Sequence, residues 1–134
     1  ITDSNIHAAL GQLDMAGVVD GPSLCVGGTP SASSVYPGTM LANIFDGNPT
    51  EPGWAGNESN GKTGWVQYTF PSPVIIVQMR MIHRLVSTGQ SPRNFQIQKS
   101  DNGSTWTTTA TYSDITAWGN VPTGYNILKF ATQL

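Results

Sequence analysis

The chain carries little charge for its length. Only 10% of the 134 residues are charged, against about 25% in an average soluble domain, and the formal net charge is −2. The six lysines and arginines are scattered and form no basic run. Binding to a phosphate backbone or to an anionic lipid surface depends on such clustered positive charge. We therefore expect no nucleic acid and no charged membrane surface as a partner.

Long apolar runs and paired cysteines are also missing. No stretch approaches the ~20 apolar residues that a membrane-spanning helix needs, so no membrane insertion is expected. Cys25 is the single cysteine and can form no internal disulfide. We expect it to be a small buried apolar residue rather than a reactive thiol.

Motifs that support catalysis are absent. There is no Gly-x-Ser-x-Gly elbow, no Gly-rich phosphate loop and no His-Glu-x-x-His pair, and His7 and His83 are isolated in sequence. Glu51 and Glu58 could pair for glycoside hydrolysis, but they lie in a segment rich in Gly and Asn. Such a segment rarely holds a carboxyl group with a raised pKa. We therefore expect a protein that is not an enzyme.

Turn-forming residues and short alternating strands are what the chain does contain. It has 15 Gly and 9 Pro, with 38% hydrophobic residues. Within residues 94–99, the apolar Phe95 and Ile97 alternate with the polar Asn94, Gln96 and Gln98, which predicts a half-buried strand. The following Asn102-Gly103 favours a tight reversal, and a second strand is expected to open at Trp106.

This pattern predicts an all-β fold. We expect an antiparallel β-sandwich or jelly roll of about eight strands, formed by one domain over residues 1–134. Trp65 and Trp106 are expected in its core. The other predicted core residues are Val66, Tyr68, Phe70, Val77, Met79, Met81, Phe95 and Ile97.

Four segments in order resemble one known family. They are Ser31-Ala-Ser-Ser-Val-Tyr36, Ala42-Asn-Ile-Phe-Asp-Gly-Asn-Pro-Thr50, Trp65-Val-Gln-Tyr-Thr-Phe70 and the stretch from Ser91-Pro to Trp106. This series is similar to the discoidin family, also called coagulation-factor C-type domains, which includes many galactose-binding carbohydrate modules. The similarity covers residues 31–106. Animal members commonly close their ends with a disulfide, so the single cysteine makes bacterial or phage members the nearer match.

The resemblance also implies a further strand after residues 125–130, where the chain instead ends at Leu134. Two interpretations are open. Within residues 1–28, the segment 1–10 could fill the sheet position of that strand, or it could be an unrelated N-terminal arm.

A ligand site at one end of the sandwich is a second implication of the resemblance. The matching loops are residues 35–39, 54–63 and 84–90. They and their flanks supply Tyr36, Trp54, Asn57, Asn60, His83 and Arg84. An aromatic face suits the apolar side of a pyranose, and amides, imidazole and guanidinium suit its hydroxyls. Alternatively, Trp54 belongs to the core, and Arg84 caps a strand or pairs with Asp46.

A structural calcium ion is a third implication. Asp46, Asn48 and Thr50 place hard oxygen ligands within five residues, as Ca²⁺ prefers. If residues 1–6 replace the terminal strand, Asp3 takes the position of the family's glutamate. The alternative is an ordinary Asx turn in which Asp46 accepts a hydrogen bond from its own loop.

Together these features predict a noncatalytic domain for adhesion to a cell-surface or extracellular glycan. The expected location is extracellular, on a cell surface or in a virion. The longer protein could be a phage tail, fibre or head-decoration protein, or a secreted bacterial protein, with neighbouring subunits as further partners. The alternative is a structural assembly module of a virion that binds no sugar.

Overall fold

The computed structural model describes residues 9–10, 12–48, 53–56, 64–82, 94–114 and 127–131. Within these residues the secondary structure is almost entirely strand, which confirms the predicted all-β class. The strands are β1 (Ala9–Leu10), β2 (Gln12–Ala16), β3 (Thr29–Ala32), β4 (Trp54–Ala55), β5 (Val66–Thr69), β6 (Gln78–Ile82), β7 (Phe95–Lys99), β8 (Thr107–Tyr112) and β9 (Ile127–Ala131). A 3₁₀ helix, η1 (Leu41–Ile44), follows β3. None of the described helical structure is long and apolar enough to cross a bilayer.

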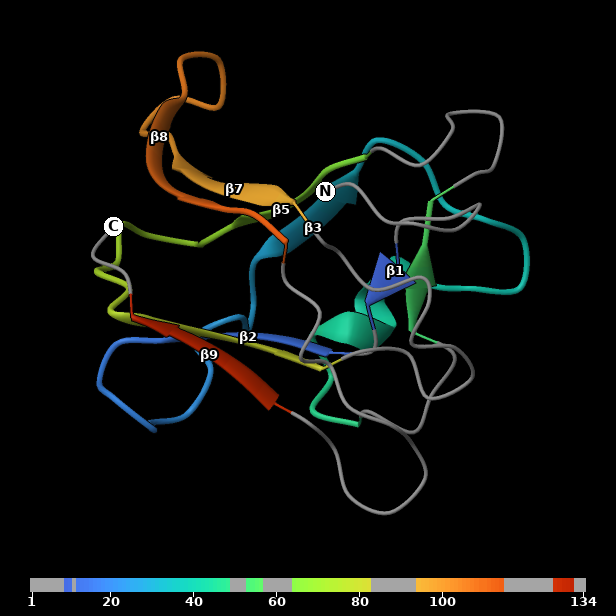
Figure 1. Ribbon diagram of the computed structural model, residues 1–134, viewed down its shortest axis with the longest axis horizontal. Coiled ribbons are helices and arrows are strands. Elements are labelled where there is room, and N and C mark those ends of the chain that lie inside the picture. The colour runs from blue at the N-terminus through green and yellow to red at the C-terminus, as the bar shows by residue number, and fades with distance from the viewer. Residues whose placement is uncertain are drawn as a thin grey trace.

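The strands form two layers, as Figure 1 shows. One layer is the antiparallel sheet β2-β6-β9, in which Met15 lies opposite Met79, and Met79 lies opposite Phe130. The other layer consists of the antiparallel pairs β3-β5 and β7-β8. The pair β1-β4 and helix η1 lie at one side of these layers.

Apolar side chains from both layers fill the space between them. The fully or nearly buried members are Leu10, Leu13, Met15, Cys25, Ile44, Trp54, Ile76, Met79, Met81, Phe95 and Ile97. Four of the predicted core residues are among them, and Val66, Tyr68 and Phe70 pack against the cluster while partly buried. The prediction that Val77 is a core residue is wrong. Val77 is half-buried, and its neighbour Ile76, at 2% exposure, takes the core position because β6 begins only at Gln78.

The expectation that Trp65 and Trp106 lie in the core is wrong. Trp65 is 51% exposed and Trp106 is 39% exposed. Tyr68 and Val66 face the core, and successive side chains of a strand point to opposite faces, so Trp65 falls on the outer face. Trp106 directly precedes β8, at the end of the loop that joins it to β7.

The predicted reversal after residue 99 is confirmed, because β7 and β8 pair antiparallel. The connection spans residues 100–106 and is wider than a two-residue turn. Ser100 Oγ accepts hydrogen bonds from the amides of Asn102 and Gly103. Asn102 Oδ1 accepts two more, from the amides of Ser104 and Thr105. These side chains satisfy the loop backbone in place of strand pairing, and Gly103 supplies the positive φ of +75° that the reversal needs.

Residues 1–8 lie outside the described part of the chain, so the terminal-strand interpretation stays a prediction there. The segment that follows belongs to the sandwich. Leu10 has no exposed surface and pairs with Trp54 across β1 and β4. Strand β2 then pairs with β6, a long-range contact in sequence.

Candidate functional site

Residues 33–40 form a loop that is fixed to the sandwich by backbone bonds to β4 and its neighbour. The Tyr36 amide donates to the Ala55 carbonyl at 2.7 Å, and the Met40 amide donates to the Gly53 carbonyl at 3.1 Å. The buried hydroxyl of Thr39 accepts from the Ala55 amide at 3.3 Å and donates to the Tyr36 carbonyl at 2.7 Å. A backbone held at several points keeps the side chains of this loop in place for recognition.

The buried side chain of Trp54 also holds this loop in place. Its indole Nε1 donates to the Ser34 carbonyl at 2.8 Å, and its side chain has no exposed surface. A fully buried ring offers no face on which a sugar could stack. The structure therefore corrects the expectation that Trp54 contacts a ligand and selects the alternative in which it is a core residue. Its effect on a ligand would be indirect, through the position of residues 33–40.

Tyr36 is the one predicted ligand residue that the structure both describes and leaves accessible. It is half-buried, on the loop that appears in cyan at the right of Figure 1. Asn57, Asn60, His83 and Arg84 lie outside the described residues. Their roles stay predictions.

The predicted calcium loop begins where helix η1 ends. Asp46 is exposed, and its Oδ1 accepts a hydrogen bond of 2.7 Å from the Asn48 amide across Gly47, whose φ is +78°. This is the Asx turn of the alternative interpretation, and it also fixes the direction of the carboxylate. A carboxylate has about four acceptor positions, so the turn leaves capacity for an ion.

The residues of this loop fit Ca²⁺ by the chemistry of their oxygen donors. Thr50 and Asp3 lie outside the described residues. Among the residues that are described, no group of three or more His, Cys, Asp and Glu side chains comes together as a metal site. A calcium ion here would depend on Asp46, with backbone and amide oxygens of the loop.

Comparison with known families decides the identity of this scaffold. A family model for NedA-like, galactose-binding domains matches residues 43–130, about two thirds of the chain. The chain belongs to this galactose-binding family. The match confirms the predicted resemblance and indicates a carbohydrate-binding role. Searches of curated proteins and of solved structures gave no match.

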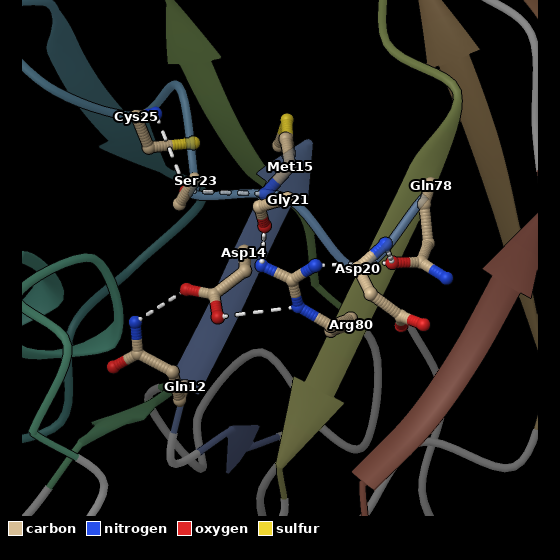
Figure 2. A network of polar contacts seen from close by, with 9 residues as sticks. All are labelled: Gln12, Asp14, Met15, Asp20, Gly21, Ser23, Cys25, Gln78 and Arg80. Atoms are coloured by element: carbon tan, nitrogen blue, oxygen red, sulfur yellow. Dashed lines mark hydrogen bonds and ion pairs between the residues drawn. The ribbon is translucent and has the colours of Figure 1, made fainter. Parts of the chain in front are cut away.

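A polar network that the sequence analysis missed lies on the sheet β2-β6-β9 of this galactose-binding domain (Figure 2). Arg80, at its centre, places Nε 3.6 Å from Asp14 Oδ2. Its Nη1 donates to Gln78 Oε1 at 3.0 Å, and its Nη2 donates to the Gly21 carbonyl at 2.6 Å. The Asp20 amide also donates to Gln78 Oε1, at 3.0 Å. The bonds to Gly21 and Asp20 join loop 17–22 to strand β6.

Gln12 extends this network, donating from Nε2 to Asp14 Oδ1 at 2.8 Å. Gln12 lies directly opposite Ile82 in the β2-β6 register, and Asp14 lies opposite Arg80. The cross-strand pair of opposite charges was the signal in the sequence. The pairing of Asp14 with Arg80 can be recognised only when the β2-β6 register is known, because the two residues are 66 positions apart in sequence.

Ser23 and Cys25 complete the region shown in Figure 2. Ser23 Oγ accepts from the amides of Met15 and Cys25, at 3.2 and 3.3 Å. Burial raises the pKa of the Cys25 thiol from 9.0 to about 11, so the group is protonated at neutral pH. A buried neutral thiol is a packing group, as the sequence predicted.

Proposed function

We propose that this domain is a noncatalytic module that binds a glycan with terminal galactose or a related sugar and so attaches a longer protein to a cell surface or to another extracellular glycan. The observation that carries the proposal is the match of residues 43–130 to galactose-binding domains. A phage tail, fibre or head-decoration protein, or a secreted bacterial protein, would be a suitable parent.

The geometry of the loop 33–40 supports this proposal. Its backbone is bonded to β4 and to the buried Trp54, so Tyr36 sits on a rigid support. Weak sugar ligands benefit from such preorganisation because little ordering entropy is lost on binding. Arg84, which we expect at the same end of the sandwich, would add several fixed donors for hydroxyl groups.

A binding assay with galactose tests the proposal. Calorimetric titration of the wild type should show binding, and Arg84→Ala should weaken it by about tenfold to a hundredfold, as expected for loss of a charge-assisted contact. Tyr36→Ala should weaken it as well. Lys99→Ala is the matched control, since it removes one positive charge from an exposed position on β7 and should leave binding unchanged. Equal affinities of Arg84→Ala and Lys99→Ala would refute the loop site.

A second candidate function is a structural module that packs against neighbouring subunits and binds no sugar. It is favoured by exposed apolar side chains on two adjacent loops, Val18, Val19 and Val26 on one and Ile75 on the other, each 62–74% exposed. The Val77 amide donates to the Ala16 carbonyl, which brings these loops together. In Figure 1 the loop after β2, in blue, lies on the opposite side from residues 33–40. Concentration-dependent association in sedimentation, abolished by Val18→Ser with Val19→Ser, would support this role.

A further inference from the structure

A shallow groove lies beside the β7-β8 hairpin, and none of its lining residues belongs to the loop 33–40. Its volume is about 360 Å³, and its lining includes the exposed Trp65 next to strand residues of the hairpin. The backbone of Trp65 is fixed, because its amide and its carbonyl both bond to Ser33 at 3.0 Å. Trp65 therefore offers a half-exposed aromatic ring from a rigid position.

Neutral polar side chains form most of the rest of this groove, beside Phe95 and Tyr112. The polar residues are Asn94, Gln96, Gln98, Thr111 and Ser113, and all are exposed. The three amides follow at every second position, so they share one face of the strand over roughly 13 Å. None of the groove's lining residues is charged.

The amides are oriented by their own hydrogen bonds. Gln98 Nε2 donates to Thr108 Oγ1 at 3.0 Å and to Gln96 Oε1 at 3.5 Å. Asn94 Oδ1 accepts from the Asp114 amide at 3.0 Å. These bonds involve Gln98 Nε2, Gln96 Oε1 and Asn94 Oδ1, so the other polar atoms of the three amides are one acceptor, Gln98 Oε1, and two donors, Gln96 Nε2 and Asn94 Nδ2. Sugar hydroxyls both donate and accept, so they complement a row of this kind.

We propose that the groove formed by Trp65 and the outer face of the β7-β8 hairpin is a second glycan-binding surface, which holds a neutral oligosaccharide chain. Trp65 would stack on the apolar face of one sugar ring, and the amide row would bond to hydroxyls of the adjoining rings. A row of about 13 Å is longer than one ring, which favours a chain over a monosaccharide. The absence of charged lining residues favours a neutral chain.

This inference rests on the proposed function for its ligand class, and it concerns a surface lined by other residues than those of the loop 33–40. The site at Tyr36 and Arg84 would bind the terminal sugar, whereas the groove would bind internal units of a chain. The two surfaces therefore predict different responses to ligand length. A monosaccharide would need the loops alone, and an oligosaccharide would gain affinity from Trp65.

Indole NMR signals of ¹⁵N-labelled protein, titrated with galactose, β-1,4-galactotetraose and cellotetraose, test the groove. A tetrasaccharide should shift the Trp65 indole signal, and Trp65→Ala should lower its affinity about tenfold while galactose affinity stays unchanged. Trp106→Ala is the matched control, because Trp106 is also an exposed tryptophan and does not line the groove. Its affinities should match those of the wild type.

Two further variants keep the result interpretable. Trp65→Phe retains a smaller ring and should retain part of the affinity, and Gln96→Ala with Gln98→Ala should weaken tetrasaccharide binding without removing any core contact. If the Trp65 signal does not move, or if Trp65→Ala binds the tetrasaccharide with unchanged affinity, the proposal that the groove binds a glycan is overturned. If Arg84→Ala still weakens galactose binding in that case, the proposed function stands. If tetrasaccharide binding depends on Trp65 and galactose binding does not depend on Arg84, the groove site stands and the loop site fails. Binding of none of the three sugars overturns both.

Discussion

Arg80 Nη2 donates a hydrogen bond of 2.6 Å to the carbonyl oxygen of Gly21, a residue 59 positions earlier in the sequence. The bond fastens the loop after β2 to the middle strand of its sheet (Figure 2). Arg80 is suited to this role because its guanidinium presents several donors in one plane. With Gln78 and Asp14 as its other partners, one side chain fixes three parts of the chain.

Arg80→Ala should therefore lower the free energy of unfolding by about 1.5–3 kcal/mol, the usual range for hydrogen bonds to a charged group. Arg80→Lys should recover only part of this loss, since an ammonium cannot reach all partners at once. Urea denaturation of the variants measures both effects. Lys99→Ala, an exposed charge on β7, should change stability by no more than about 0.5 kcal/mol. A small effect of Arg80→Ala would show that the network stabilises little.

The layered fold could be predicted because alternation and turn residues are local signals. Apolar and polar residues alternate clearly from Asn94 to Gln98, and the structure places Phe95 and Ile97 in the core as expected. The size of Trp65 favours a core position, but Trp65 is out of phase with Val66 and Tyr68, which face the core. Period two alone would have placed Trp65 outside.

The site was less predictable because it depends on registers between distant segments. The pairing of Asp14 with Arg80 follows from the β2-β6 register, and the groove at Trp65 follows from the position of β5 beside β7. Nothing local in the sequence specifies either relationship. The role of Trp54 could not be predicted for a similar reason. An aromatic residue next to a ligand loop can contact the ligand, or it can be buried and hold the loop in place, and the local sequence is the same in both cases.

Trp54→Ala should cost about 3–5 kcal/mol of stability, because it removes a large, fully buried side chain and leaves a cavity. Trp54→Phe should cost less, about 1–3 kcal/mol, through the smaller ring and the loss of the hydrogen bond from the indole to the Ser34 carbonyl. Thermal denaturation and galactose titration, done on the same samples, separate the two roles of this residue. If Trp54→Phe lost sugar binding with full stability, Trp54 would be a ligand contact after all.

The raised pKa of Cys25 predicts a loss of stability in alkali. The unfolded thiol ionises near pH 9.0, whereas the buried one ionises near pH 11. Below pH 9 the thiol keeps its proton in both the folded and the unfolded state, so the stability that the buried neutral thiol contributes is fully present. Between pH 9 and 11 the unfolded state releases its proton first, so the free energy of unfolding should fall by roughly 1.4 kcal/mol per pH unit from this group.

Cys25→Ala provides the comparison for that prediction. It should be less stable at neutral pH through lost packing, and its stability should fall less steeply between pH 9 and 11 than that of the wild type. Urea denaturation across this range gives both slopes. Parallel slopes would mean that the thiol is not the group that titrates. Thiol labelling of the wild type at pH 8 should likewise be slow in the native state and fast in urea.

Calcium bound by the Asp46 loop should raise the melting temperature, because an ion that binds only the folded state stabilises it by mass action. At a free concentration of about 100 times the dissociation constant the gain is about 2.7 kcal/mol. Chelator should therefore lower the melting temperature of the wild type. Asp46→Asn keeps an oxygen that can accept from the Asn48 amide, but it removes the negative charge that a Ca²⁺ site requires. Its melting temperature should not respond to calcium.

Asp101→Asn is the control for charge alone, because Asp101 is also an exposed aspartate in a turn and lies in the β7-β8 loop. This variant should keep the full calcium response of the wild type. If chelator leaves the wild-type melting curve unchanged, the loop is an Asx turn and nothing more. If the calcium response of the melting temperature disappears equally in Asp46→Asn and Asp101→Asn, calcium acts by diffuse charge screening, because both aspartates then matter only through their charge. A response lost in Asp46→Asn alone would assign the ion to the loop that follows η1.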